Sequence, residues 1–177
     1  MNFPRTTVGG ISLPRMLIGC NWISGFSHRG AAGDTMIRKA HRDPASTAAI
    51  FQTFMNSGVD AVLGLFGVDA NLSKAVKMAE DATGKQMIIV DTLVLNMDDT
   101  AMARHEAELE IKASAARGAT FCLPLHSSVE QLINKNTETM DRLPDYLRMI
   151  RDAGMIPGLS AHMPEVIQYA DKNDYDV

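Results

Sequence analysis

FCLPLHSS, residues 121–128, has the pattern of a buried strand that delivers a histidine and two serines at its C-terminal end. A second run, MIPGLSAH at residues 155–162, repeats this pattern and ends in Ser160 and His162. Repeated strands that present polar side chains at one end are how a (β/α)8 barrel builds its active site. The two stretches therefore predict a parallel α/β fold with a functional site at the C-terminal ends of its strands.

Around these stretches, apolar runs of strand length alternate with amphipathic segments of helical length. A hairpin is expected first, with residues 3–8 paired to residues 11–14 around the Gly9-Gly10 turn. The expected strands then cover residues 16–19, 60–65, 87–90, 120–125 and 155–159. The expected helices run from Asp43-Pro44 to Gly58, over 70–82, from Asp98-Asp99 to Arg117 and over 164–170. A further helix is expected after Asn136-Thr137, with an interruption at Pro144 and an end at Ala153-Gly154. Residues 20–42 are expected to form a long polar loop, and no antiparallel pair is expected after the opening hairpin.

We therefore expect an α/β chain of the (β/α)8 TIM-barrel type that is partial over residues 1–177. It would hold the N-terminal hairpin, about five βα units and, at residues 175–177, the start of a sixth strand. Such barrels usually need about 250 residues. The prediction is thus one barrel domain that is incomplete at the C-terminus, or one that a partner subunit completes as a homo-oligomer. A doubly wound sheet is disfavoured, because no Gly-x-Gly-x-x-Gly motif follows the first strand.

The amino-acid composition disfavours several classes of binding partner. The net charge is −4 and the pI about 5.7, so no basic field favours nucleic acid or an anionic membrane surface. The longest apolar runs are far shorter than the roughly 20 residues that span a bilayer. The two cysteines, Cys20 and Cys122, are expected to be reduced thiols of a cytoplasmic protein.

The candidate site residues follow from the shared mouth of the expected strands. His126 is the leading catalytic candidate because imidazole exchanges protons near neutral pH, and Asp91 would orient it or share its proton. Substrate binding is assigned to the remaining polar and aromatic groups near the strand ends and in the first long loop: Asn21, Trp22, Arg29, Ser127, Ser160 and His162. In this set Arg29 would bind a substrate carboxylate or phosphate through its planar fork.

Other roles for the same residues remain open. His126 and His162 could be satisfied by local hydrogen bonds alone. With Asp91 they would also make a set of two histidines and one carboxylate, which favours a metal-dependent lyase or hydrolase. Ser127 and Glu130 have the spacing of a helix capping box. A non-catalytic oligomerising protein is the third alternative.

Four segments also match a known family in order along the chain. They are residues 3–19, residues 56–60, Leu125-His126 and residues 158–166. Together they resemble the aldo/keto reductase superfamily, in which a strand-four histidine works with an Asp, a Tyr and a Lys. The resemblance implies a TIM barrel and an NADP cofactor.

The chain differs from that family at the catalytic positions, and these differences determine which activity we expect. Leu63 or Gly64 stands where the Asp belongs, no tyrosine occurs between Gly58 and Asp145, and the third strand brings no lysine. The family's NADP phosphate loops follow its last two strands, which this chain does not contain, so the cofactor stays unknown. We expect a small polar metabolite to bind at the strand ends, without ordinary carbonyl reduction.

Overall fold

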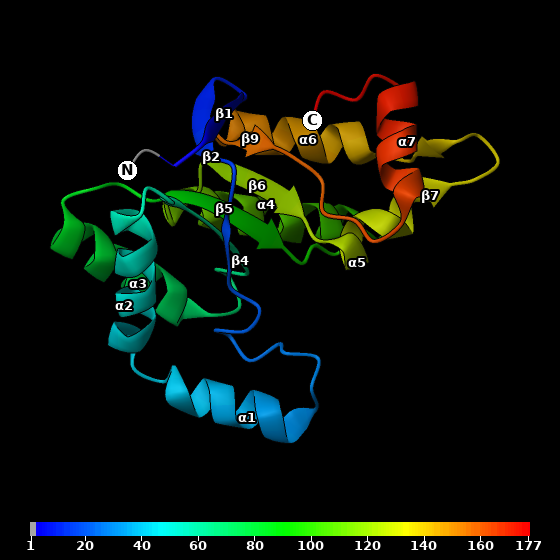
Figure 1. Ribbon diagram of the computed structural model, residues 1–177. Coiled ribbons are helices and arrows are strands. Elements are labelled where there is room, and N and C mark those ends of the chain that lie inside the picture. Colours follow the sequence, from blue (N-terminus) through cyan, green and yellow to red (C-terminus); the bar gives the residue numbers. More distant parts are fainter. Residues whose placement is uncertain (1–2) are drawn as a thin grey trace. The chain divides into compact units, whose positions relative to one another are not determined.

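The computed structural model describes residues 3–177 as an α/β chain whose helices flank a five-stranded parallel sheet (Figure 1). The strand order is β3-β4-β5-β6-β9, so each strand neighbours the next parallel strand along the chain. These strands are β3 (Ile18–Gly19), β4 (Ala61–Gly64), β5 (Ile88–Leu93), β6 (Phe121–Pro124) and β9 (Ile156–Pro157). The chain divides within β5 into two compact units, one up to Val90 and one from Asp91 onward.

The first unit opens with the predicted hairpin. Strands β1 (Arg5–Val8) and β2 (Ile11–Pro14) pair antiparallel, with Val8 opposite Ile11. Gly9 and Gly10 form the turn with φ of 55° and 81°. Two consecutive positive φ values suit the tight hairpin turn that matches strand twist, and glycine adopts them at little cost. The hairpin prediction is confirmed.

Two helices of the first unit also begin and end as the sequence predicts. Helix α2 (Pro44–Asn56) starts where the Asp43 side chain accepts a hydrogen bond from the Ala45 N–H. Helix α3 (Ala70–Thr83) ends at Gly84, which is left-handed with φ of 67°. Phe51 and Met55 of α2 are fully buried in the core of this unit. Local capping chemistry therefore sets these boundaries.

The long loop predicted over residues 20–42 is wrong in its second half, which forms helix α1 (Ala31–Ala40). None of the residues of α1 is buried, and its N-cap, Gly30, offers no side-chain cap. The helix therefore lacks the polar cap by which a helix start is recognised in sequence, and it contributes nothing to the core.

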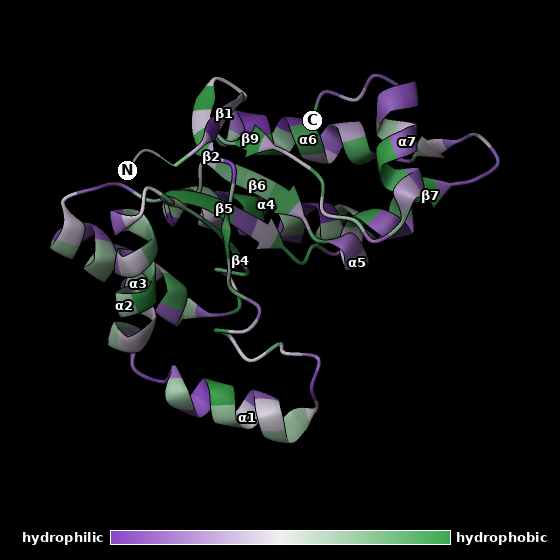
Figure 2. Ribbon diagram, viewed as in Figure 1, coloured by the Kyte–Doolittle hydropathy of each residue, from purple (hydrophilic) through white to green (hydrophobic). Residues whose placement is uncertain are grey.

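The second unit packs helices α4 (Ala101–Ala116), α6 (Leu143–Asp152) and α7 (Pro164–Lys172) around a core that includes Ile111, Leu143 and Ile150. Strands β5 and β6 are mostly hydrophobic (Figure 2), as strands covered on both faces require. The cap of α4 is Thr100, whose hydroxyl accepts from the Ala103 N–H, and not the predicted Asp98-Asp99 pair.

The helix predicted after Asn136-Thr137 is confirmed in its second half, where α6 ends just before Ala153, and is wrong in its first half. Before α6 the chain forms α5 (His126–Val129), the 3-10 turn η1 (Glu130–Leu132) and an antiparallel hairpin, β7 (Ile133–Asn134) with β8 (Thr139–Met140). The Asn134 side chain accepts from the Asn136 N–H, which closes the chain into a turn. Pro144 lies in the first turn of α6, where it starts the helix and does not interrupt it.

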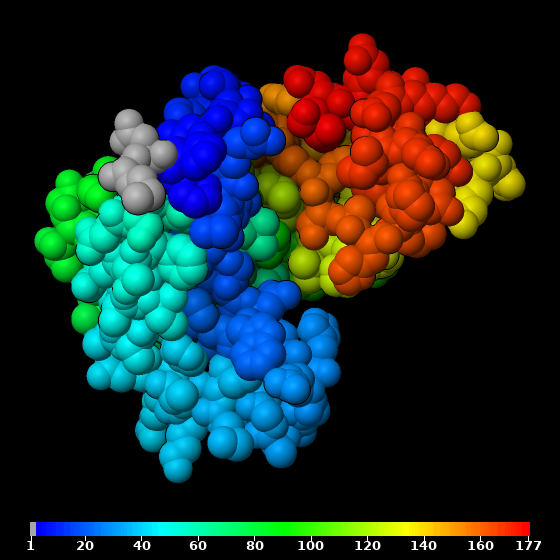
Figure 3. Space-filling view, in the orientation of Figure 1, coloured from blue at the N-terminus to red at the C-terminus, as the bar shows by residue number. Residues whose placement is uncertain are grey.

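The start of a sixth strand, predicted at residues 175–177, is wrong. These residues have no regular structure in the described chain. Helix α7 lies against the β7–β8 hairpin, as the orange-red and yellow surfaces in Figure 3 show. Tyr175 bonds back to the Ala170 carbonyl and to the backbone of Met140. None of the helices within residues 3–177 has the length and apolar character needed to cross a membrane.

Candidate functional site

The structure brings His126 and His162 together at one edge of the sheet in the second unit. His126 follows β6 directly, and His162 lies in the segment between β9 and α7. Strands β6 and β9 are parallel neighbours, with Phe121 opposite Ile156, so their C-terminal ends meet at the same edge. The two imidazole rings stack with centroids 3.9 Å apart and planes inclined by 24°. His126 is half-buried in this arrangement and His162 is exposed.

Glu130 completes this cluster, although nothing in the sequence places it there. Its Oε1 accepts hydrogen bonds from the backbone N–H of His162 (2.5 Å) and of Met163 (3.0 Å). The hydrogen bond from the His162 N–H is the main reason that the pKa of the Glu130 carboxyl lies below its usual value. The bond from the Met163 N–H and the nearby His126 and His162 lower this pKa further. The predicted capping box is wrong, because α5 begins at His126 with Leu125 as its N-cap, and Glu130 accepts from the two residues that precede α7.

The serines around the two histidines differ in what they can offer a ligand. Ser127 is exposed and Ser160 half-buried, beside His126 and His162 respectively. Ser128 is buried, and its hydroxyl accepts a 2.8 Å hydrogen bond from the Leu95 N–H. The hydroxyl of Ser128 therefore serves the fold, while Ser127 and Ser160 stand beside the histidine pair.

Asp91 lies elsewhere than the sequence predicts. Strand β5 continues to Leu93, so Asp91 falls inside the strand and not at its C-terminal end. Its side chain is 0% exposed and accepts hydrogen bonds from Ser114 (2.7 Å) and Arg117 (3.1 Å) of the α4 region. Cys122 shares this interior, where burial and the Asp91 charge raise the pKa of its thiol to about 12. A ligand in solvent cannot reach the Asp91 carboxylate in this conformation.

The three candidates of the first unit, Asn21, Trp22 and Arg29, lie in the exposed segment after β3. The Arg29 guanidinium lies 5.9 Å from the centroid of the Trp22 ring, within cation–π distance. The Asn21 carbonyl accepts from the Phe26 N–H and so closes the loop on itself. The structure thus pairs Trp22 with Arg29 on one exposed face of this loop.

The two-histidine, one-carboxylate set considered from the sequence is not formed. Ring nitrogens point outward in the plane of each imidazole, so two stacked rings do not direct them at a common point. Asp91 is held by Ser114 and Arg117. Within residues 3–177, no group of three or more histidine, cysteine, aspartate or glutamate side chains is arranged to hold a metal ion.

The residues that were aligned with the reductase's Asp and Lys supply neither group. A Cβ atom on Gly64 would lie 3.0 Å from Cys20 Cβ and 3.1 Å from Leu72 Cδ1, so a side chain there would require these neighbours to move. The third strand was expected to end at Val90-Asp91-Thr92 without the family's lysine, and β5 contains no lysine through its last residue, Leu93. These residues do not fit the proton-donating set of an NADP-dependent reductase, and we derive no reduction step for this chain.

Comparison with known proteins gives no further guide. No protein-family model matches the chain, and no curated protein matches it significantly.

Proposed function

We propose that the chain binds a small polar metabolite at the C-terminal ends of β6 and β9, with His126 as the acid–base group. The observation that carries this proposal is the stacking of His126 on His162 at that edge, 3.9 Å between ring centroids. An imidazole held in one orientation by a neighbouring ring can accept or donate a proton without first losing rotational freedom. The exposed hydroxyl of Ser127 supplies a neighbouring hydrogen-bonding group for the metabolite.

Glu130 supports this role through its charge. The nearby His126 and His162 help to lower the pKa of the Glu130 carboxyl, which keeps a carboxylate beside the group that would exchange the proton. Glu130 is meanwhile fixed by the backbone N–H groups of His162 and Met163. In this proposal, the orienting function that the sequence assigned to Asp91 belongs to His162 and Glu130.

We also propose that the sheet is part of a (β/α)8 barrel related to the aldo/keto reductases. Two features support this: the opening β1–β2 hairpin and the strictly sequential strand order. A doubly wound sheet reverses its strand order at a switch point, and the order β3-β4-β5-β6-β9 contains no reversal. The C-terminal edge is where such barrels place their active sites.

The test is an NMR titration of the full chain with a panel of small aldehydes, ketones, hydroxy acids and polyols. We expect at least one of these to shift the amide resonances of His126, Ser127 and Ser160. His126→Gln should abolish that response, whereas His105→Gln, a substitution on the exposed face of α4, should keep it. The proposal fails if none of the panel shifts these resonances, or if His126→Gln responds as the wild type does.

A further inference from the structure

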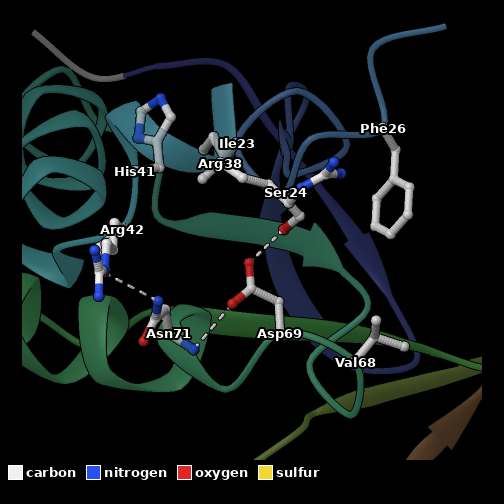
Figure 4. Close-up of a pocket in the computed structure, with 9 residues that line it drawn as sticks. All are labelled: Ile23, Ser24, Phe26, Arg38, His41, Arg42, Val68, Asp69 and Asn71. Atoms are coloured by element: carbon white, nitrogen blue, oxygen red, sulfur yellow. Dashed lines mark hydrogen bonds between the residues drawn. The ribbon is translucent and has the colours of Figure 1, made fainter. Parts of the chain in front are cut away.

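The first unit contains a cavity of about 330 Å³ that has no part in the site at His126. Segments of three parts of the chain surround it: the loop after β3, the end of α1 with the following linker, and the start of α3 (Figure 4). Its lining residues are Ile23, Ser24, Phe26, Arg38, His41, Arg42, Val68, Asp69 and Asn71. This volume is at the lower end of the range of small-molecule sites.

The floor of the cavity is fixed by hydrogen bonds around Asp69. Its carboxylate accepts from the Ser24 hydroxyl (2.7 Å) and from the Asn71 N–H (3.0 Å), as the dashed lines in Figure 4 show. The Asn71 side chain in turn donates to the Arg42 carbonyl (3.4 Å). Asp69 is therefore committed to capping α3 and holding the loop, and a cavity built this way is largely preformed.

The cationic groups around this floor retain free donors. Arg38 donates to the Gly25 carbonyl (3.2 Å) and to Thr35 (3.5 Å), which leaves further N–H groups of its guanidinium for a ligand. The Arg42 guanidinium has no hydrogen bond or ion pair with any side chain or backbone group of residues 3–177. His41 Nδ1 lies 3.4 Å from Ser46 Oγ and 3.3 Å from Thr47 Oγ1, which orients the ring and leaves its Nε2 free of these contacts.

The remaining wall is apolar and partly open to solvent. Phe26 is 39% exposed and Val68 is 61% exposed, beside the buried Ile23. Large apolar side chains that border a cavity gain free energy when a ligand covers them. The two arginines outnumber the single carboxylate, so the cavity combines a net positive lining with an apolar surface.

We propose that this cavity binds a small organic anion that carries one carboxylate or phosphate group on an apolar body. Arg42 and Arg38 hold the acid group by charge-assisted hydrogen bonds, and His41 adds a third donor. The apolar body lies against Phe26 and Val68. Carboxylates and phosphates both accept such hydrogen bonds, and the titration with matched probes distinguishes between the two acid groups.

The experiment is an NMR titration of the full chain with three probes of one body: benzoate, phenyl phosphate and the neutral benzyl alcohol. At least one of the two anions should bind about tenfold more tightly than benzyl alcohol. The shifted amides should fall in residues 23–26, 38–42 and 68–71. Tighter binding of benzoate identifies a carboxylate as the natural group, and tighter binding of phenyl phosphate identifies a phosphate.

Matched variants separate a site from a general charge effect. Arg42→Met and Arg38→Met should each weaken binding of the anion about tenfold. Lys39→Met removes the same charge from the same segment outside the cavity lining and should leave the affinity unchanged. The Arg42 guanidinium has no partner among the described residues, and the Arg42 carbonyl that accepts from Asn71 is kept in the variant, so the replacement should not alter the thermal unfolding midpoint.

Two results would overturn the proposal: equal affinity for the anions and benzyl alcohol, or equal loss of affinity in Lys39→Met and Arg42→Met. His126→Gln should bind the anion normally, so failure here is distinct from failure of the function proposed at the strand ends.

Discussion

The ring of His162 lies against the ring of His126, 3.9 Å between centroids, while Glu130 binds the backbone N–H of His162. His126 and Glu130 both belong to the continuous segment α5–η1 that follows β6. This segment therefore holds the chain before α7 at two points, one through a side chain and one through the backbone. The His126 ring thus packs against a segment that Glu130 also anchors.

Ser127 and Ser128 provide a matched pair of substitutions for the neighbouring segment. Ser128→Ala should lower the free energy of unfolding by about 1–3 kcal/mol, because the buried Leu95 N–H loses its acceptor. Ser127→Ala should change it by less than about 0.5 kcal/mol, because the hydroxyl is on the surface. Urea unfolding of both variants checks this. Equal losses in the two variants would contradict the division between a fold-supporting and a ligand-facing serine.

The buried ion pair between Asp91 and Arg117 gives a second prediction. Arg117→Met should lower the free energy of unfolding by about 3–5 kcal/mol, because it leaves the fully buried Asp91 carboxylate without its cationic partner. Lys112→Met breaks an exposed pair with Glu108 on the same helix and should have a much smaller effect. Guanidinium unfolding of both variants measures the difference. A loss in Arg117→Met as small as that in Lys112→Met would contradict the cost assigned to the buried Asp91 charge.

The features that the sequence predicted well are those set by neighbouring residues. Gly9-Gly10, Asp43-Pro44 and Gly84 act on their own turns and helix ends, and each of these boundaries is correct. Helix α1 was missed because it has no buried residue, and the β7–β8 hairpin was missed because its strands are only two residues long. Short or fully exposed elements leave little periodic signal.

In the site too, features set by neighbouring residues were predicted, whereas contacts between residues far apart in the chain were not. His126 and His162 were both found because each follows an apolar strand, but their stacking depends on the register of β6 against β9. Asp91 was misplaced because the strand was ended at Val90, where the apolar run stops, whereas β5 continues through the buried polar Asp91 and Thr92 to Leu93. Glu130 was misread because its partners, His162 and Met163, lie beyond α6 and β9 in the chain. Contacts of this kind are specified only by the folded sheet.

The two thiols should be inert in the folded protein. Burial raises the pKa of Cys20 to about 12 and that of Cys122 to about 12, so about 10⁻⁴ of either thiol is ionised near pH 8. Because the thiolate is the reacting species, a disulfide reagent should label neither cysteine in the native state and both after unfolding in guanidinium. Rapid labelling of one native thiol near pH 8 would contradict the buried environment of that cysteine.

Glu130 should make the stability of the fold depend on acidity. Its folded pKa lies below the ordinary value of 4.5, chiefly because the His162 N–H binds the ionised form. The unfolded chain therefore takes up the proton first, and the stabilising contribution of Glu130 is complete above the ordinary pKa and is lost as the pH falls through the lower folded value. Glu130→Gln should be less stable than the wild type at about pH 7, and the difference should shrink at about pH 3.5.

Glu110→Gln, on the exposed face of α4, is the control and should follow the wild type at both pH values. Urea unfolding gives the free energies, and the proton resonances of the His126 ring report the contact directly. In the folded wild type the His162 ring shifts these resonances by its ring current; in Glu130→Gln the shift should decrease, because the His162 backbone loses its charged acceptor. If the stability difference were the same at both pH values while the ring shift persisted, Glu130 would have no part in positioning His162.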